Sequence, residues 1–326
     1  NKARFFILRY MREPMKYYMP PEADEFLHLV KEEFARSFDI EESFISDWLK
    51  HHNESKGKWI RARLALASGG LLGLSSQTYI KWAVVCELIH SASLLHDDIC
   101  DEDSMRRGKK SLWKEFGIPA AVCTGDYLIA ESFRKITEIE QGWHQNILLK
   151  LLSCSVKEII FGQSQDVSLD HLTLTKDQCR KIAIDKTAPL IALPMMGMFR
   201  CKELAEDECV ALKEISNELG FAYQYLNDIE NIIGFEQEIS SDFLKGHPNF
   251  MVIRILENLS ALEKKVIFKQ PSKFNDFISE RNFIQSQEEI AAILNNAMLN
   301  NHRLPIIIQP IMESLKDEII KRLNLI

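Results

Sequence analysis

Residues 77–108 read QTYIKWAVVCELIHSASLLHDDICDEDSMRRG, and this stretch decides the fold class. From Gln77 to His96 the apolar side chains cover more than one helical stripe, which is typical of a helix buried on most of its sides. A helix of that kind has to be surrounded by other helices. The run therefore predicts the central helix of a helical bundle.

A dense polar segment closes this run. Asp97, Asp98 and Asp101, which we call the first motif, are followed closely by Arg106 and Arg107. On a helix, Asp97 and Asp101 would share one face with their Cβ atoms about 5–6 Å apart. Such carboxylates repel unless cations bridge them, and Mg²⁺ prefers carboxylate oxygens and shares its other positions with substrate phosphates. The arginines offer donor forks to the same phosphates. The segment predicts a metal-bridged diphosphate site, although a solvated acidic helix end would show the same spacing.

The composition limits the kinds of partner. The chain has 326 residues, of which 46% are hydrophobic and 27% charged, and it lacks linker-like Gly/Ser/Pro stretches, so we expect one domain over residues 1–326. A net charge of −7 argues against binding to nucleic acid. The seven scattered cysteines form no C-x-x-C pair, and no apolar run reaches the length of a membrane span. We therefore expect a cytoplasmic protein with reduced thiols and no membrane span.

Helical spacing continues through most of the chain. The long blocks between the ten prolines are rich in Leu, Ile, Ala, Glu and Lys, and no segment alternates as a strand does. We expect an all-α protein without a sheet.

A second apolar run, at residues 211–233, also ends in polar side chains. Asn227, Asp228 and Asn231, which we call the second motif, repeat the spacing of the first motif. The two long helices are expected to face each other, so that the two motifs clamp one diphosphate.

Together, the two motifs resemble those of the trans-isoprenyl diphosphate (polyprenyl) synthases, and the resemblance covers residues from about 55 to 250. It implies an all-α, isoprenoid-synthase-type bundle around a deep central cavity, assembled as a homodimer. It also implies a Mg²⁺-dependent prenyltransferase that condenses an allylic prenyl diphosphate head to tail with isopentenyl diphosphate into an all-E product, using three Mg²⁺ ions per active site. The metal ligands that carry over are Asp97, Asp98, Asp101, Asn227 and Asp228.

Shorter segments match further motifs of the family in the same order. KGKWIRA at 56–62 resembles G-G-K-R-x-R-P, GQSQD at 162–166 resembles G-Q-x-x-D, and residues 186–187 match the family's K-T pair. The resemblance assigns substrate binding to Lys58, Arg61, His90, Arg106, Arg107, Gln163 and His247. It assigns the leaving diphosphate and the developing carbocation to Lys186, Thr187 and Gln224.

The length of the product is expected to depend on two small residues before the first motif. Ala92 and Ser93 lie about one helical turn before Asp97 and leave no bulky floor there. In the family, aromatic residues at these places stop elongation early, so the resemblance implies a product of geranylgeranyl length or longer. Ile89 or Phe133 could still close the tunnel.

Three positions depart from the family pattern and keep rival functions open. Asn227 and Asn231 stand where Asp is usual, and His247 stands where Lys is expected, so we expect weaker metal binding and low or redirected activity. The rivals are a class I terpene cyclase, a weakly active or non-catalytic subunit, and prenyl transfer to another acceptor. The cyclase motif N-D-x-x-S-x-x-x-E is only nearly matched, because Phe235 stands at its Glu position. The retained cationic residues favour chain elongation.

Overall fold

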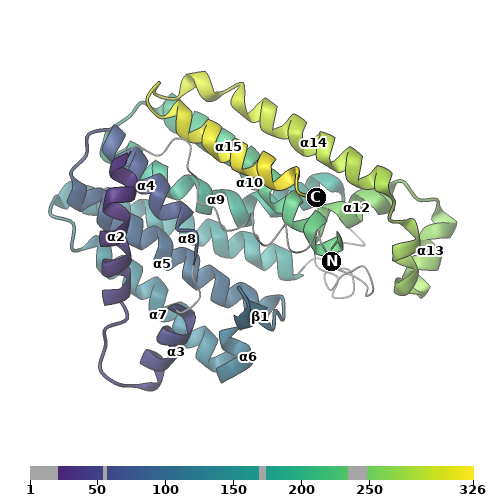
Figure 1. Cartoon of the computed structure of the whole chain (residues 1–326), viewed down its shortest axis with the longest axis horizontal. Helices are drawn as coiled ribbons and strands as arrows, with labels where there is room; N and C mark the ends of the chain where they lie inside the picture. The colour runs from purple at the N-terminus through teal and green to yellow at the C-terminus, as the bar shows by residue number, and fades with distance from the viewer. Residues whose placement is uncertain (1–20, 54–56, 169–173, 234–247) are drawn as a thin grey trace. The chain divides into compact units, whose positions relative to one another are not determined.

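The computed structural model describes residues 21–53, 57–168, 174–233 and 248–326, and most of them are helical (Figure 1). Their contacts group into two compact units. The first unit comprises the chain up to Lys157, Leu190–Cys209 and Pro305–Ile311; the second comprises Glu158–Pro189, Val210–Leu304 and Met312–Ile326. The expectation of a single domain stays a prediction.

Helices α8 (Gly142–Ser168), α9 (Lys176–Cys201) and α10 (Glu206–Ile233) contribute residues to both units, as does α15 (Gln309–Leu323) through its first three residues. The other elements of the first unit are α2 (Pro21–Arg36), α3 (Phe44–Asn53), α4 (Ile60–Leu71), α5 (Ser76–Cys100), β1 (Met105–Arg106), β2 (Lys109–Lys110), α6 (Leu112–Phe116) and α7 (Ile118–Ile136). The second unit adds α12 (Phe250–Glu257), α13 (Ala261–Lys269), η1 (Pro271–Phe277), α14 (Glu280–Met298), η2 (Asn301–Arg303) and most of α15 (Gln309–Leu323).

Helix α5 is buried along most of its length, as its apolar pattern predicts. It begins where the Ser75 side chain accepts a hydrogen bond of 3.3 Å from the Thr78 backbone N–H, which satisfies an amide that the helix itself cannot pair. Trp82 is fully buried and donates its Nε1–H to the carbonyl of Pro194 at 3.0 Å. The predicted central helix is confirmed, and it extends from Ser76 to Cys100.

The expectation of no sheet is wrong in one short place. Strands β1 and β2 form an antiparallel hairpin in which Met105 pairs with Lys110. The two residues between the strands, Arg107 and Gly108, have φ of 52° and 83°, and a two-residue hairpin turn requires such positive values. Strands of two residues are too short for an alternating pattern to appear in the sequence.

In the second unit, the fully buried Tyr225 of α10 is the contact point between this helix and its neighbours. The Tyr225 hydroxyl donates to Ser286 Oγ of α14 at 2.8 Å, and its ring meets the ring of Phe250 of α12 at 4.6 Å. Arg254 of α12 donates to the same Ser286 oxygen at 3.0 Å. These contacts fix α12 and α14 against the end of α10 that carries the second motif.

Helix α9 is long and apolar enough, by length and composition alone, to cross a membrane. Its most apolar 18-residue window has a mean hydropathy of 1.3, and 56% of that window is buried inside the structure. The core helix of a soluble protein meets the same criterion, so this helix is weak evidence for a span. The expected absence of a span stays a prediction. All seven cysteines are free thiols, four of them buried.

Candidate active site

The first motif lies at the C-terminal end of α5. Asp97 and Asp98 belong to its last turn, and Asp101 follows as the C-cap residue. The Asp101 backbone N–H donates to the carbonyl of Asp97 at 2.8 Å, so these two residues stay one helical turn apart, as their spacing predicts. Carboxylates at a helix C-terminus face the negative end of the helix dipole as well as one another. The cluster therefore needs cations nearby.

Arg106 supplies one of these cations. Its Nε–H donates to Asp98 Oδ1 at 2.6 Å, a second N–H donates to the same oxygen, and Asp103 Oδ2 lies 3.2 Å from Nη2. The Asp98 side chain is only 3% exposed. Burial raises the pKa of Asp98 to about 6; Arg106 opposes this rise, whereas the charges of Asp103 and Asp101 add to it. The middle carboxylate of the first motif is thus already held by a side chain of the protein.

The hairpin turn separates the two adjacent arginines. Arg106 is the last residue of β1, whereas Arg107 occupies the turn. A Cβ atom added to Gly57 would lie 3.1 Å from Arg107 Nη1, so the Arg107 guanidinium reaches the loop before α4. The Lys110 carbonyl also lies 3.0 Å from His51 Nε2, which ties the hairpin to α3. The structure thus brings Arg107 next to the segment that contains Lys58.

Three predicted substrate-binding residues share one electrostatic environment in the first unit. Burial lowers the pKa of His90 well below its ordinary value, and the positive charges of Arg61 and Arg107 lower it further. The imidazole is therefore neutral at neutral pH. Its buried Nδ1 has no hydrogen-bond partner among the described residues. Leaving a buried polar atom without a hydrogen bond costs free energy. His90 Nδ1 is therefore suited to form a hydrogen bond with a bound ligand.

Glu87 lies beside this cluster, although no motif of the sequence points to it. Its carboxylate accepts the backbone N–H of Ala62 at 2.9 Å, in the first turn of α4, directly after Arg61. Burial raises the pKa of Glu87, although Arg61 and the Ala62 N–H oppose the rise. An acidic residue inside the apolar run of α5 was the signal that could have revealed it.

His52 was also missed. Burial lowers the pKa of His52 of α3 to about 4, and the positive charges of Arg107, His51 and Arg106 lower it further. It falls outside every motif that the sequence offers, so no sequence signal pointed to it.

Trp59 departs from the family pattern and shapes the loop before α4. It has a left-handed φ of 57° and is the N-cap residue of that helix. A non-glycine residue in this conformation is strained, and packing has to hold it. The Trp59 and Phe34 rings are nearly perpendicular with their centres 5.1 Å apart, and Lys31 Nζ lies 5.9 Å from the centre of the Trp59 ring. This anchored turn separates the exposed Lys58 from Arg61.

The predicted residues of the second unit form a chain of hydrogen bonds. Thr187 Oγ1 donates to Gln224 Oε1 at 3.4 Å, and Gln224 Nε2 donates to Asp228 Oδ1 at 3.0 Å. Lys186 Nζ lies 2.8 Å from Asp166 Oδ2, so the lysine of the K-T pair meets the aspartate of the G-Q-x-x-D segment. The structure thus places these five residues in two hydrogen-bonded sets, one of three residues and one of two.

Gly162 allows this arrangement by letting two helices approach closely. A Cβ atom at Gly162 of α8 would lie 2.6 Å from the backbone carbonyl carbon of Asp185 and from the backbone nitrogen of Lys186, both in α9. Only a glycine fits such a contact without moving the backbone. The next residue, Gln163, has a buried side-chain amide whose nitrogen and oxygen both lack a hydrogen-bond partner among the described residues. It fits a polar ligand as His90 does.

The second motif is arranged differently from the first. Asp228 is buried, and its Oδ2 accepts the backbone N–H of Phe250 at 2.8 Å, which anchors the start of α12. Asn227 Oδ1 accepts a hydrogen bond of 2.7 Å from Nη2 of Arg322 in α15, and Asn231 is exposed. Arg322 lies close to the C-terminus, in no motif of the sequence, so it was missed.

The two residues expected to set product length, Ala92 and Ser93, lie on α5 before the first motif. Ala92 is buried with 1% of its surface exposed, and Ser93 is half-buried and donates its hydroxyl to the His90 carbonyl at 2.9 Å. His247 lies outside the described residues. The expectation that the two motifs face each other stays a prediction.

The donor atoms of the first motif suit a hard divalent ion. Asp97 and Asp101 are half-buried carboxylates one turn apart, and Mg²⁺ prefers such oxygen ligands. No group of three or more His, Cys, Asp or Glu side chains in the described part of the chain is close enough to hold a metal by itself. The paired carboxylate oxygens of the first motif suit a hard ion whose other positions a diphosphate can fill.

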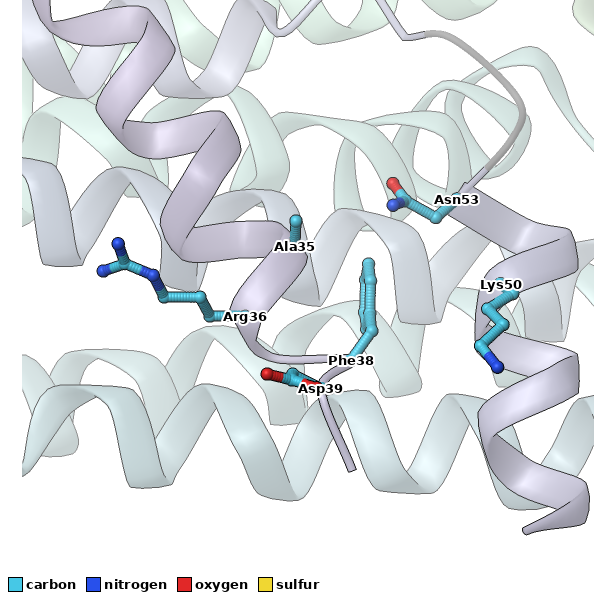
Figure 2. Close-up of a pocket in the computed structure, with 6 residues that line it drawn as sticks. All are labelled: Ala35, Arg36, Phe38, Asp39, Lys50 and Asn53. Carbon is cyan, nitrogen blue, oxygen red and sulfur yellow. The ribbon is translucent and has the colours of Figure 1, made fainter. Parts of the chain in front are cut away.

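One open pocket lies elsewhere in the first unit. Figure 2 shows it between the end of α2 and α3, with the Phe38 ring standing between the two helices. It is lined by Ala35, Arg36, Phe38, Asp39, Lys50 and Asn53. None of the predicted site residues lines it, so we do not assign substrate binding to it.

Carboxylates at the end of a buried helix, with arginines held beside them in an all-α fold, are the features of a protein that binds diphosphates through metal ions. A sequence model of the family described as polyprenyl synthetase matches residues 42–283. The chain belongs to this family, so the predicted membership and the predicted class of enzyme, a prenyltransferase, are confirmed.

Similar proteins agree with this assignment. The geranylgeranyl diphosphate synthase of Saccharolobus solfataricus is 31% identical over 219 residues, 65% of this chain and 66% of the relative. The short chain isoprenyl diphosphate synthase of Methanocaldococcus jannaschii is 30% identical over 220 residues, 66% of this chain and 67% of the relative. The match thus spans about two thirds of these relatives.

The fold is shared with solved structures. A decaprenyl diphosphate synthase from Rhodobacter capsulatus aligns with a TM-score of 0.81 at 24% identity, covering 92% of this chain and 97% of that one. The predicted all-α, isoprenoid-synthase-type fold is confirmed, whereas its central cavity stays a prediction. Family membership is also consistent with a divalent-metal cofactor.

Proposed function

We propose that this chain condenses an allylic prenyl diphosphate head to tail with isopentenyl diphosphate and requires Mg²⁺. The relatives named above are isoprenyl diphosphate synthases, and their names support this reaction. A class I terpene cyclase is not favoured by these similarities.

The cluster of Arg61, His90 and Arg107 is the observation that carries the proposal. The positive charges of Arg61 and Arg107 act both on the buried carboxyl of Glu87 and on the imidazole of His90, and that carboxyl accepts the Ala62 N–H at the start of α4. This set can bind a second diphosphate in addition to one at the first motif, because arginine forks match phosphate oxygens and His90 Nδ1 needs a partner. A cyclase has only one diphosphate to bind.

The residues of the first motif divide the work between them. Asp97 and Asp101 would hold the metal, which when bound neutralises the charge that develops on the departing diphosphate. Asp98 positions Arg106, whose hydrogen bonds to that buried carboxylate fix the guanidinium beside the motif. We therefore assign Asp98 a positioning role and Arg106 a contact with the allylic diphosphate.

In the second unit, Lys186 would bind the leaving diphosphate, and Asp166 orients it. Thr187 and Gln224 are held by each other, which leaves the lone pairs of the Thr187 hydroxyl oxygen to stabilise positive charge on the prenyl group. Gln163 presents an unpaired amide for the same ligand. Holding two substrates in one geometry can lower the barrier by about 7–11 kcal/mol.

A substrate panel tests the proposal. The purified chain is incubated with Mg²⁺, labelled isopentenyl diphosphate and dimethylallyl, geranyl, farnesyl or geranylgeranyl diphosphate, and the products are identified by mass. We expect labelled, longer prenyl diphosphates. Hydrocarbon release from farnesyl diphosphate without isopentenyl diphosphate would instead support the cyclase, and the absence of any turnover would support the non-catalytic subunit.

We also propose a product of geranylgeranyl length or longer, because Ala92 and Ser93 are small. The similar proteins carry names for products of different lengths, so the names leave the length open. Ser93→Phe should shorten the product, and so should Ala92→Phe, although the full burial of Ala92 makes the latter variant more disruptive. Unchanged product length in both variants, by chromatography, would refute this assignment.

A cytoplasmic homodimer completes the proposal. Phe116 of α6 and Ile118 and Val122 of α7 expose 42%, 51% and 39% of their surface. Apolar side chains grouped in this way favour contact with a second copy of the chain. The mass of the purified protein by light scattering tests it, and a monomeric mass at micromolar concentration would contradict it.

A further inference from the structure

Three side chains hold Arg322 at the first position of the second motif. Its Nε–H donates to Glu230 Oε1 at 2.6 Å, and an Nη2 N–H donates to Glu230 Oε2. Nη2 also donates to Asn227 Oδ1 at 2.7 Å. The guanidinium carbon lies 5.0 Å from the centre of the Tyr223 ring, which adds a cation–π contact.

The Arg322 guanidinium donates to the side-chain oxygen of Asn227, the atom that a metal ion would need. Asn227 has one side-chain oxygen, and this oxygen is the only atom of its side chain that can ligate a hard cation. A divalent ion on the same oxygen would lie close to the positive charge of Arg322. Arg322 is also held there by its ion pair with Glu230. A divalent ion that is only weakly attracted to Asn227 would have to displace this paired guanidinium.

The other members of the second motif offer little to a metal. Asp228 is 3% exposed, and both of its oxygens accept hydrogen bonds, from Gln224 and from the Phe250 backbone. Asn231 is neutral. The motif therefore presents one buried carboxylate that is occupied by structural hydrogen bonds, and its donor set does not fit a divalent ion as that of the first motif does.

We propose that Arg322 is the resident cation of the second motif and replaces the divalent ion there, so that metal binds only at the first motif. The inference rests on the proposed function in one respect, namely that the ligand held with the metal is a diphosphate. It revises the three Mg²⁺ ions per active site that the family resemblance implies. It also accounts for the asparagine at 227, since an amide oxygen accepts the guanidinium without adding a second charge beside Glu230.

The test counts bound metal instead of following turnover. Free Mn²⁺ is measured by electron paramagnetic resonance with the full-length protein and saturating inorganic pyrophosphate, which gives the ions bound per chain. We expect Asn227→Ala to bind as many Mn²⁺ ions as the unmodified chain, because Arg322 and not a metal occupies the amide oxygen. The loss of one ion per chain in Asn227→Ala would overturn the proposal.

A double variant gives the converse result. Asn227→Asp with Arg322→Met supplies a carboxylate and removes the guanidinium, while methionine keeps an apolar stem against Tyr223. We expect one Mn²⁺ ion more per chain than in the unmodified protein, and an equal count in a double variant that melts cooperatively would overturn the proposal. If this variant does not fold, the count for Asn227→Ala decides alone.

Arg303→Met is the matched control. Arg303 also reaches α10, where its Nη1 lies 2.5 Å from Glu214, so its loss breaks a comparable ion pair in the same unit. The Mn²⁺ count should not change. Because the count needs no condensation, a chain that fails the substrate panel but shows these counts would refute the proposed function and leave this inference standing.

Discussion

The two polar motifs have the same spacing, but in each of them an arginine binds a different position. In the first motif, Arg106 donates hydrogen bonds to the middle residue, Asp98, and we propose the outer carboxylates, Asp97 and Asp101, as the metal ligands. In the second, Arg322 is bonded to the first residue, Asn227. Spacing alone therefore does not define a metal site, because the position of the protein's own cation decides which oxygens a metal can use.

The largest expected contrast is in catalysis. Asp97→Ala and Asp101→Ala should each lower kcat/KM by at least about 10³-fold, because they remove the groups that hold the charge-neutralising ion. Asn227→Ala should lower it by less than about tenfold, because Arg322 and Glu230 remain. The measurement is steady-state condensation over a range of Mg²⁺ concentrations.

The activity of Asn227→Ala decides whether the two motifs differ. If Asn227→Ala is as inactive as Asp97→Ala while both variants keep their melting temperature, the two motifs work alike and the comparison is wrong. Extra Mg²⁺ should partly rescue Asp101→Ala, since one carboxylate of the pair remains. It should leave the activity of Asn227→Ala relative to the unmodified chain unchanged.

The sequence predicted the first motif more fully than the second. An apolar run that covers most of a helix surface fixes α5, and spacing by four residues fixes the relation between Asp97 and Asp101, since both are local properties of one helix. The partner of Asp98 was also within reach, because Arg106 follows eight residues later. Local pattern and local structure agree here.

Contacts between distant residues were not predictable in this way. Arg322 meets Asn227 across 95 positions of sequence, and Glu87 meets the start of α4 across 25. A pattern of apolar residues shows which helices form, but it does not show which polar side chains meet when they pack. The turn at Arg107 escaped notice for another reason, since two positive φ values leave little trace besides Gly108.

The second prediction concerns Arg106, the cation of the first motif. Arg106→Met should lower kcat/KM by about 10²-fold, because it removes a donor to the allylic diphosphate. It should also cost about 3 kcal/mol of stability, because it leaves the buried Asp98 carboxylate unpaired. Kinetics and thermal melting measure the two effects.

A second substitution separates those effects. Asp98→Asn combined with Arg106→Met removes the unpaired charge, so the melting temperature should recover while activity stays low. If activity also recovers, Arg106 acts only by neutralising Asp98, and its proposed contact with substrate is refuted. Arg106→Lys should lie between the wild type and Arg106→Met, because lysine keeps the charge but not the paired donors.

The third prediction tests how the helices of the second unit position Lys186. Gly162→Ala places a methyl group 2.6 Å from the backbone of α9, and backbone cannot turn aside as a flexible side chain does. We expect a loss of about 1–3 kcal/mol in stability and a lower kcat, because the shift moves Lys186 away from Asp166. Gly70→Ala is the control: no atom lies within 4 Å of its new Cβ, and alanine should stabilise α4 by about 0.5–1 kcal/mol. Equal stability of both variants would show that the close approach does not matter.

The smallest expected effect comes from an ion-pair network in the first unit that takes no part in either motif. Glu33 of α2 binds Lys81 of α5 at 2.6 Å and lies 3.4 Å from Lys135 of α7. Burial alone would raise the pKa of Glu33, but the lysines outweigh it and lower the pKa to about 2. Because the folded-state pKa is depressed, this carboxylate stabilises the fold above pH 4.5, and the contribution is lost as the pH falls from 4.5 towards 2.

Glu33→Gln should therefore cost about 1–2 kcal/mol at pH 7, less than the pKa shift alone would give, because solvent screens part of the interaction. That corresponds to a fall of about 2–4 °C in melting temperature for each kcal/mol, and the difference from the unmodified chain should shrink between pH 4.5 and 3. Glu206→Gln breaks the exposed pair with Arg200, at 2.6 Å, and should leave the melting temperature unchanged.

A Glu33→Gln difference that stays constant down to pH 3 would mean that the glutamine disturbs packing and that the charge contributes nothing. A change in Mg²⁺ dependence would mean that this network reaches the first motif through α5, and the separation between structural and metal-binding carboxylates would fail.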